Sequence, residues 1–71
     1  MAEEQSVKTL VDDYTNALYI YICSTYELGA LTSEAKWTAK RITLSTGLTQ
    51  YADGNDRPDN IADNRASLTY I

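Results

Sequence analysis

Histidine and phenylalanine are missing from this 71-residue sequence, and cysteine, proline, tryptophan and methionine each occur once. Without histidine, the chain has no Ser-His-Asp or Cys-His catalytic pair. A single thiol, Cys23, excludes an intrachain disulfide and, with scattered carboxylates, makes no zinc site. The glycine-rich phosphate-binding motif is also absent. We therefore predict a protein that is not an enzyme and has no metal or other cofactor.

Signals for secretion and for membrane insertion are missing as well. The first six residues are acidic and polar, whereas a secretory leader is basic and then apolar. The longest apolar run, Ala17 to Cys23, is far shorter than the ~20 residues that span a bilayer. One cysteine without a disulfide framework fits a reducing compartment. We expect an intracellular (cytoplasmic) protein, or part of a particle assembled there such as a virion, with no membrane partner.

The first segment of the chain has apolar residues at helical spacing. They are Val7, Leu10, Val11, Tyr14, Leu18, Tyr21, Ile22, Thr25 and Leu28. Steps of three and four predict a helix near residues 3–28, with Gly29 as its C-terminal cap. Leu18 to Ile22 also alternates with high strand propensity, so a strand is the alternative there. The end of this helix is apolar nearly all round, which indicates burial on more than one side.

A second helix is predicted near residues 33–51. Ser33 followed by Glu34 is typical of a helix N-terminus. One face of this helix would carry Trp37, Leu44, Leu48 and Tyr51. Several threonines and Gly47 weaken it, and Ile42 to Leu44 has a strand as its alternative. The predicted fold is mostly α, a two-helix antiparallel hairpin over residues 1–52.

The last part of the chain, residues 53–71, is predicted to be an extended, irregular C-terminal arm. Asp53 and Gly54 favour a tight turn, and Pro58 cannot lie inside a helix. The final residues from Leu68 to Ile71 alternate and are expected to bind a neighbouring subunit, with Arg57 and Arg65 holding the arm against an acidic first helix of that neighbour. The alternative is that the arm packs back on its own hairpin.

Assembly is the predicted function, because a chain this short buries a small core and has no disulfide or metal to stabilise it. We predict a structural subunit of a larger complex, such as a small virion or filament component, with copies of itself or other proteins as partners. The expected interface residues are Tyr14, Leu18, Tyr21, Ile22, Trp37, Leu44, Leu48, Tyr51, Leu68, Tyr70 and Ile71.

The alternative function is a small DNA-binding regulator of the helix-turn-helix type. Gly29 would provide the turn, and Lys36, Lys40 and Arg41 would lie on a recognition helix. The chain has a net charge of −4, however, and acidic proteins lack the positive surface that attracts phosphates. Nucleic acid is therefore the less favoured partner.

Overall fold

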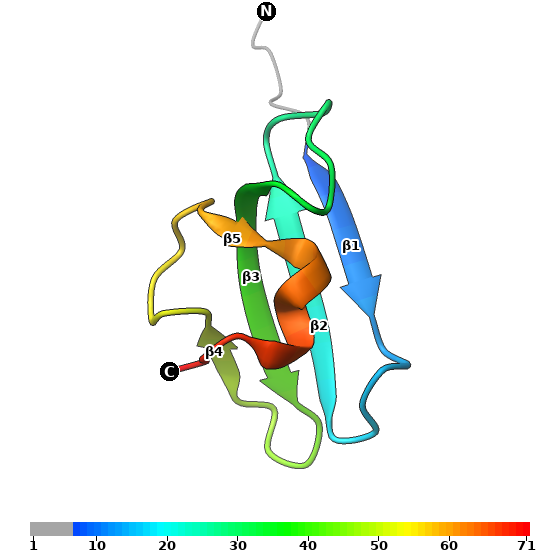
Figure 1. Cartoon of the computed structure of the whole chain (residues 1–71). Helices are drawn as coiled ribbons and strands as arrows, with labels where there is room; N and C mark the ends of the chain where they lie inside the picture. Colours follow the sequence, from blue (N-terminus) through cyan, green and yellow to red (C-terminus); the bar gives the residue numbers. More distant parts are fainter. Residues whose placement is uncertain (1–6) are drawn as a thin grey trace, which may run out of the picture.

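The computed structural model describes residues 7–71 and shows an antiparallel β-sheet with one short 3-10 helix (Figure 1). The strands are β1 (Lys8–Asp12), β2 (Tyr19–Thr25), β3 (Ala35–Thr43), β4 (Thr49–Tyr51) and β5 (Asn60–Ile61). The helix η1 (Ala62–Ser67) follows β5 directly. Strands β1 to β4 lie side by side in sequence order, and β5 pairs with the beginning of β3.

The predicted helical hairpin is wrong. Residues 19–25 form β2 and residues 35–43 form β3, and the described part of the chain contains no α-helix. The sequence of β2, Tyr-Ile-Tyr-Ile-Cys-Ser-Thr, consists of aromatic, β-branched and small residues that pack well on a pleated sheet. Its apolar residues point to both faces of the sheet, which is why the segment resembles a helix that is apolar all round. The strand alternatives at Leu18–Ile22 and Ile42–Leu44 are the better predictions, although Leu18 and Leu44 lie just outside the strands.

The two glycines predicted to end or weaken helices lie in connections between strands. Gly29 belongs to the loop from β2 to β3. Gly47, with φ of 73°, completes the turn from β3 to β4, where its N–H donates to Thr43 O at 2.7 Å. The tight turn predicted at Asp53 and Gly54 is confirmed, because both residues have positive φ and Asn55 N–H donates to Ala52 O.

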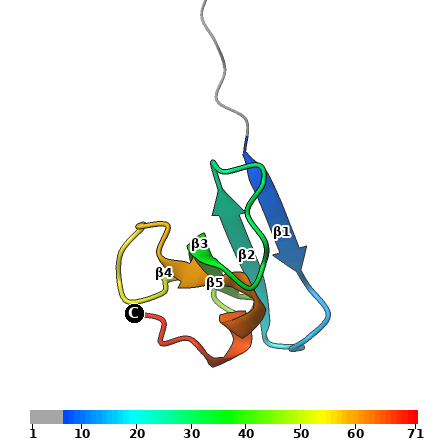
Figure 2. The ribbon, with the colours of Figure 1, turned by 45° about the horizontal axis from the view of Figure 1, so that its top comes forward.

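The C-terminal segment packs on its own sheet rather than extending away. Helix η1 lies across one face of β2 and β3 (Figures 1 and 2). Tyr70 is buried, pairs with Ala52 in an isolated bridge, and donates its hydroxyl hydrogen to Arg65 O at 2.7 Å. The C-terminal segment therefore packs against its own chain, as the alternative prediction stated.

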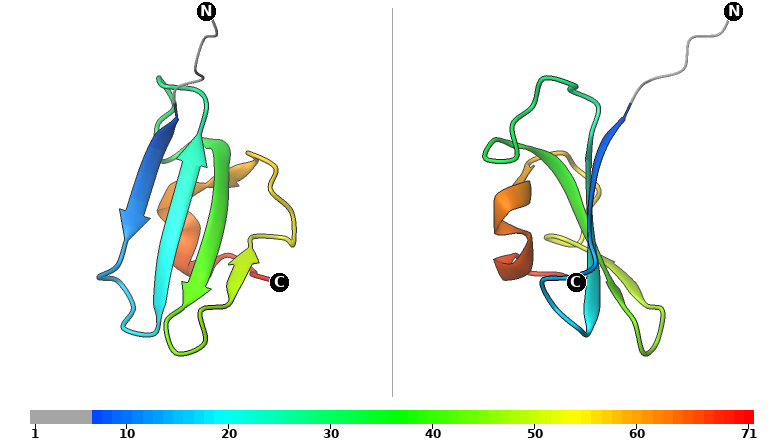
Figure 3. Two further views of the ribbon diagram at one scale, coloured as in Figure 1. Left: turned by 180° about the vertical axis from the view of Figure 1, so that it is seen from behind. Right: turned by 90° about the vertical axis from the view of Figure 1, so that its right-hand side faces the viewer.

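The core is small and lies between the sheet and the segment that contains η1. Its buried residues are Tyr21, Cys23, Ala30, Trp37, Ala39, Ala52, Ala62 and Tyr70, with Leu10, Tyr19 and Leu68 packed against them. Cys23 is fully buried in β2 and is not part of a disulfide. Within residues 7–71, all covering elements lie on this one side of the sheet, and none lies on the other side (Figure 3).

Candidate interaction surface

The uncovered side of the sheet, which we name the open face, is lined by alternate residues of strands β1 to β4. Tyr21 and Cys23 of β2 point into the core, so their neighbours Ile20 and Ile22 point to the opposite side. Applying this alternation across the strand register assigns the open face to Thr9, Val11, Ile20, Ile22, Ser24, Thr38, Lys40, Ile42, Thr49 and Tyr51. No segment of residues 7–71 lies in front of these strands in the left view of Figure 3.

A row of side chains crosses the open face from one strand to the next, and all of them except Lys40 are apolar or aromatic. Val11 is paired with Ile22, Ile22 with Lys40, and Lys40 with Tyr51. In a second row, Ile20 is paired with Ile42. Directly opposed residues have Cβ atoms ~4.5–5.5 Å apart, so these side chains form one continuous surface. Val11 remains 56% exposed, and the isoleucines and Tyr51 are half-buried by their neighbours.

Lys40 is the only charged residue among the ten assigned to the open face. Within residues 7–71 its ammonium group has neither an ion pair nor a hydrogen bond. By contrast, Lys8, Lys36, Arg41 and Arg65 each have a polar partner in the structure. A single positive charge therefore lies between the apolar side chains of Ile22 and Tyr51.

Predicted interface residues divide into three groups in the structure. Ile22 and Tyr51 lie on the open face. Tyr14, Leu18, Leu44, Leu48 and Ile71 are exposed in turns or at the C-terminus, and Leu44 N–H donates to Leu18 O beside the open face. Tyr21, Trp37, Leu68 and Tyr70 lie in or against the core, where they stabilise the fold and are covered by their own chain.

Several residues of the open face are absent from the sequence-based set, notably Val11, Ile20, Lys40 and Ile42. The signal that identifies Ile20 together with Ile22 is the alternation from Leu18 to Ile22, because it places both on one face of a strand. For Lys40 no sequence signal was available, since its position between Ile22 and Tyr51 depends on strand register.

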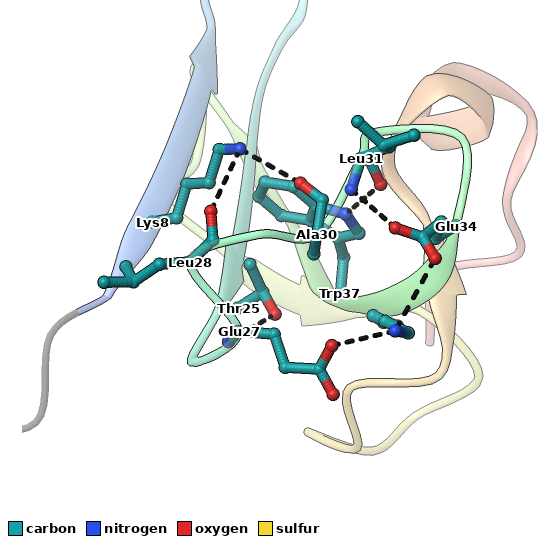
Figure 4. Close-up of polar contacts among 9 residues, drawn as sticks. Lys8, Thr25, Glu27, Leu28, Ala30, Leu31, Glu34 and Trp37 are labelled. Carbon is teal, nitrogen blue, oxygen red and sulfur yellow. Dashed lines mark hydrogen bonds and ion pairs between the residues drawn. The ribbon is translucent and has the colours of Figure 1, made fainter.

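The opposite side of the sheet is closed near β1 by the loop of residues 26–34, which polar contacts hold in place (Figure 4). Lys8 Nζ donates to Ala30 O at 3.0 Å, and Trp37 Nε1 donates to Leu31 O at 3.0 Å. The Glu34 carboxylate accepts the Leu31 N–H at 2.8 Å. These contacts bury Ala30 and leave Leu31 exposed, so the loop covers the core with its backbone and small side chains.

A buried ion pair joins β1 to η1 on the covered side. Asp12 is fully buried, and its Oδ2 lies 2.7 Å from Arg65 Nε. Its Oδ1 accepts the backbone N–H groups of Tyr14 and Thr15. Burial raises the pKa of Asp12, but the hydrogen bonds from Thr15, Tyr14 and Arg65 outweigh it and hold the pKa well below its usual value. Arg65 was predicted to hold the arm against the first helix of a neighbouring copy, whereas in the structure it pairs with Asp12 of its own chain.

Arg41 occupies the covered side as well. Its guanidinium lies 4.3 Å from the centre of the Tyr19 ring and 4.9 Å from that of Tyr70, and its NH2 group donates to Gln50 at 2.7 Å. Lys40 and Arg41 therefore point to opposite sides of the sheet. The DNA-binding alternative requires a recognition helix, but this segment forms a loop and β3. The predicted helix-turn-helix motif is therefore wrong.

Neither the described structure nor the comparison with known proteins indicates a functional site of another kind. No pocket is detected in residues 7–71, and these residues hold no group of three or more potential metal ligands. The same part of the chain has no helix long and apolar enough to cross a membrane. No protein-family model matches the chain, and neither a curated protein nor a solved structure shows significant similarity to it. A functional interpretation therefore depends on the geometry of the chain itself.

Proposed function

We propose that this protein is a non-enzymatic assembly subunit that binds another protein through the open face of its sheet. The observation that supports the proposal is the row Val11–Ile22–Lys40–Tyr51, apolar or aromatic except at Lys40, which no element of the described chain covers. An antiparallel sheet with one solvated face normally carries polar residues on that face. Here Ile20, Ile22 and Ile42 occupy its centre among threonine, serine and lysine side chains, and apolar surface of this kind marks interaction sites.

The chemistry of the open face favours a protein partner. The surface is a sheet face without a detected pocket, and small-molecule sites are concave. It combines aliphatic side chains with Tyr51 and only one charge, which matches the centre of protein interfaces, where charged residues are depleted and tyrosine is enriched. A larger particle, such as a virion or a filament, would supply this partner.

Lys40 determines what the partner must provide. Docking of an apolar surface would remove water from its ammonium group, and the desolvation of an unpaired charge is costly. A partner with an aspartate or glutamate opposite Lys40 would offset that cost and fix the orientation of docking. The occupant is therefore a protein surface that is apolar around a single carboxylate.

Site-specific photocrosslinking in cells that naturally produce the protein tests this function. A photoreactive amino acid at Tyr51 should crosslink to one defined protein, and the same group at Asp63, which is exposed beyond the sheet, should not. The captured protein, once purified, should bind the wild-type chain and lose affinity at least about tenfold for Lys40→Glu. Lys40→Arg, which keeps the charge, is the matched control.

Two results would contradict the proposal. One is equal crosslinking from residues 51 and 63, which would mean that the open face has no special role. The other is a partner whose affinity is unchanged by Lys40→Glu. A reversed charge on the partner's matching carboxylate should restore binding of Lys40→Glu, which tests the pairing itself.

A further inference from the structure

The two outer edges of the sheet differ in how they are covered. Along β4, Ala52 forms a bridge with Tyr70, Asp53 N–H donates to Thr69 O, and Ile71 N–H donates to Tyr51 O. The C-terminal residues thus close that edge. Strand β1 pairs with β2 on one side only, and no described segment runs along its other side (Figures 1 and 3). One five-residue strand therefore has a free edge.

The hydrogen-bond pattern identifies the backbone groups on this free edge. Leu44 N–H donates to Leu18 O. In this register the even-numbered residues of β2 therefore direct their backbone N–H and C=O groups toward β3. The bond from Ala52 N to Ala39 O agrees, because it directs the odd-numbered residues of β3 toward β4. The odd-numbered residues of β2 consequently bond to Lys8, Leu10 and Asp12. Thr9 and Val11 then direct their N–H and C=O groups outward.

Strand β1 lacks the usual protection of an exposed edge. Proline, bulges and outward charges normally prevent edge strands from pairing with other chains. Strand β1 contains no proline, and its register with β2 is regular. Its two charges are engaged within the molecule, Lys8 by Ala30 O and Asp12 by Arg65. Val11 is 56% exposed beside this edge, so apolar surface and unpaired backbone groups occur together.

We propose that β1 pairs with β1 of a second copy of this chain, antiparallel and centred on Leu10. In this register the Thr9 backbone exchanges hydrogen bonds with the partner's Val11, and Val11 does so with the partner's Thr9. Leu10 lies opposite the partner's Leu10. The two sheets join into one across a two-fold axis.

Charge complementarity favours a second copy as the occupant and selects this register. The sequence of β1, Lys-Thr-Leu-Val-Asp, has opposite charges at its two ends. Antiparallel pairing about Leu10 places Lys8 opposite the partner's Asp12 at both ends of the strand pair. A shift of two residues in either direction would place Leu10 opposite a charged residue of the partner instead. The Lys8 and Asp12 side chains keep their contacts within their own chain, so this register adds attraction between unlike charges across the strand pair and forms no new ion pair.

Such a dimer would double the proposed binding surface, because opposed residues of paired strands lie on the same face. Thr9 and Val11 of both copies would meet on the open face, and the two open faces would form one surface. The pairing itself rests on the free edge and not on the proposed function. Lys40→Glu should therefore leave the dimer unchanged while it weakens binding of the partner protein.

Amide hydrogen exchange of the wild-type protein, measured over a range of concentrations alongside sedimentation equilibrium, tests the pairing. The Leu10 amide, which bonds to β2, should be protected at every concentration. The amides of Thr9 and Val11 should exchange quickly in dilute solution and slowly in concentrated solution, where sedimentation gives the mass of a dimer. Fast exchange of Thr9 and Val11 at all concentrations, or a monomer mass throughout, would overturn the proposal.

A pair of variants at Thr9 separates edge pairing from other modes of association. Thr9→Pro removes an outward N–H from each copy without removing a bond to β2, and should weaken dimerisation by at least about tenfold. Thr9→Val keeps the N–H and should leave dimerisation unchanged. A dimer equally stable in Thr9→Pro would refute the proposal. If Thr9→Pro fails to fold, the exchange pattern of the wild-type protein decides.

Discussion

Asp12 and Arg65, separated by 53 positions in the chain, form the only buried ion pair of residues 7–71, with Oδ2 and Nε 2.7 Å apart. The pair connects the first strand to the helix that covers the sheet. Arg65 Nη1 also donates to Ala62 O, and the Arg65 carbonyl accepts a hydrogen bond from the Tyr70 hydroxyl. One guanidinium-bearing residue thus links β1, η1 and the C-terminal segment.

Replacement of Arg65 by leucine should destabilise the fold severely, because it leaves the Asp12 carboxylate buried without its ionic partner. We expect the melting temperature to fall by about 10 °C or more, measured by circular dichroism. Arg57→Leu is the control, since Arg57 is exposed and its side chain forms no hydrogen bond or ion pair within residues 7–71. Asp12→Asn combined with Arg65→Leu should recover part of the loss. An unchanged melting temperature for Arg65→Leu would show that the pair contributes nothing.

Acid should destabilise the protein through the same carboxylate. The pKa of Asp12 in the folded protein lies below its ordinary value of 3.8, so its stabilising effect is complete above that value and is lost as the pH falls below it. Urea midpoints measured from about pH 5 to about pH 2 should decline, and the decline should be smaller in Asp12→Asn. Asp13→Asn, at an exposed position, should retain the wild-type decline.

Alkaline pH should destabilise the protein because two buried groups, Cys23 and Tyr70, have raised pKa values in the folded state. Burial raises the pKa of the Cys23 thiol from 9.0 to about 11, so the folded state binds this proton more tightly than the unfolded chain does. Stability is complete below pH 9 and is lost as the pH rises toward 11. Burial raises the pKa of Tyr70 as well, which adds to the loss. Cys23→Ala should reduce the decline without removing it, and equal pH profiles for both proteins would refute the role of Cys23.

Trp37 should stabilise the loop of residues 26–34. Its side chain is 1% exposed and its indole N–H donates to Leu31 O. Trp37→Phe loses this bond and part of the core volume, and should lower the free energy of unfolding by about 1–3 kcal/mol. Faster exchange of amides in residues 26–34 should accompany the loss. Tyr26→Phe, at an exposed position of the same loop, is the matched control.

Some features of this structure were predictable from the sequence because they depend on neighbouring residues. The Asp53–Gly54 turn follows from the tolerance of these residue types for positive φ. The burial of Cys23 follows from the apolar run around it. The Asp12–Arg65 pair is different, because its partners lie 53 positions apart, and charge alone led us to expect Arg65 against a neighbouring copy.

The fold itself was mispredicted for a physical reason. Steps of three and four between apolar residues from Val7 to Leu28 also arise when a strand carries apolar side chains on both faces and a turn continues the spacing. Residue type was the better guide, because tyrosine, isoleucine and threonine favour strands. The open face could not be predicted from the sequence, because the row Val11–Ile22–Lys40–Tyr51 depends on the register of four strands.

The central claim is that the open face of the sheet binds another protein, and hydroxyl-radical footprinting tests it most directly. Side-chain oxidation should be compared between the isolated chain and the native assembly purified from its source. We predict that Tyr51 and Ile42 become protected in the assembly, whereas Leu31, on the covered side, is oxidised equally in both. Equal oxidation of Tyr51 and Ile42 in the two samples would contradict the claim.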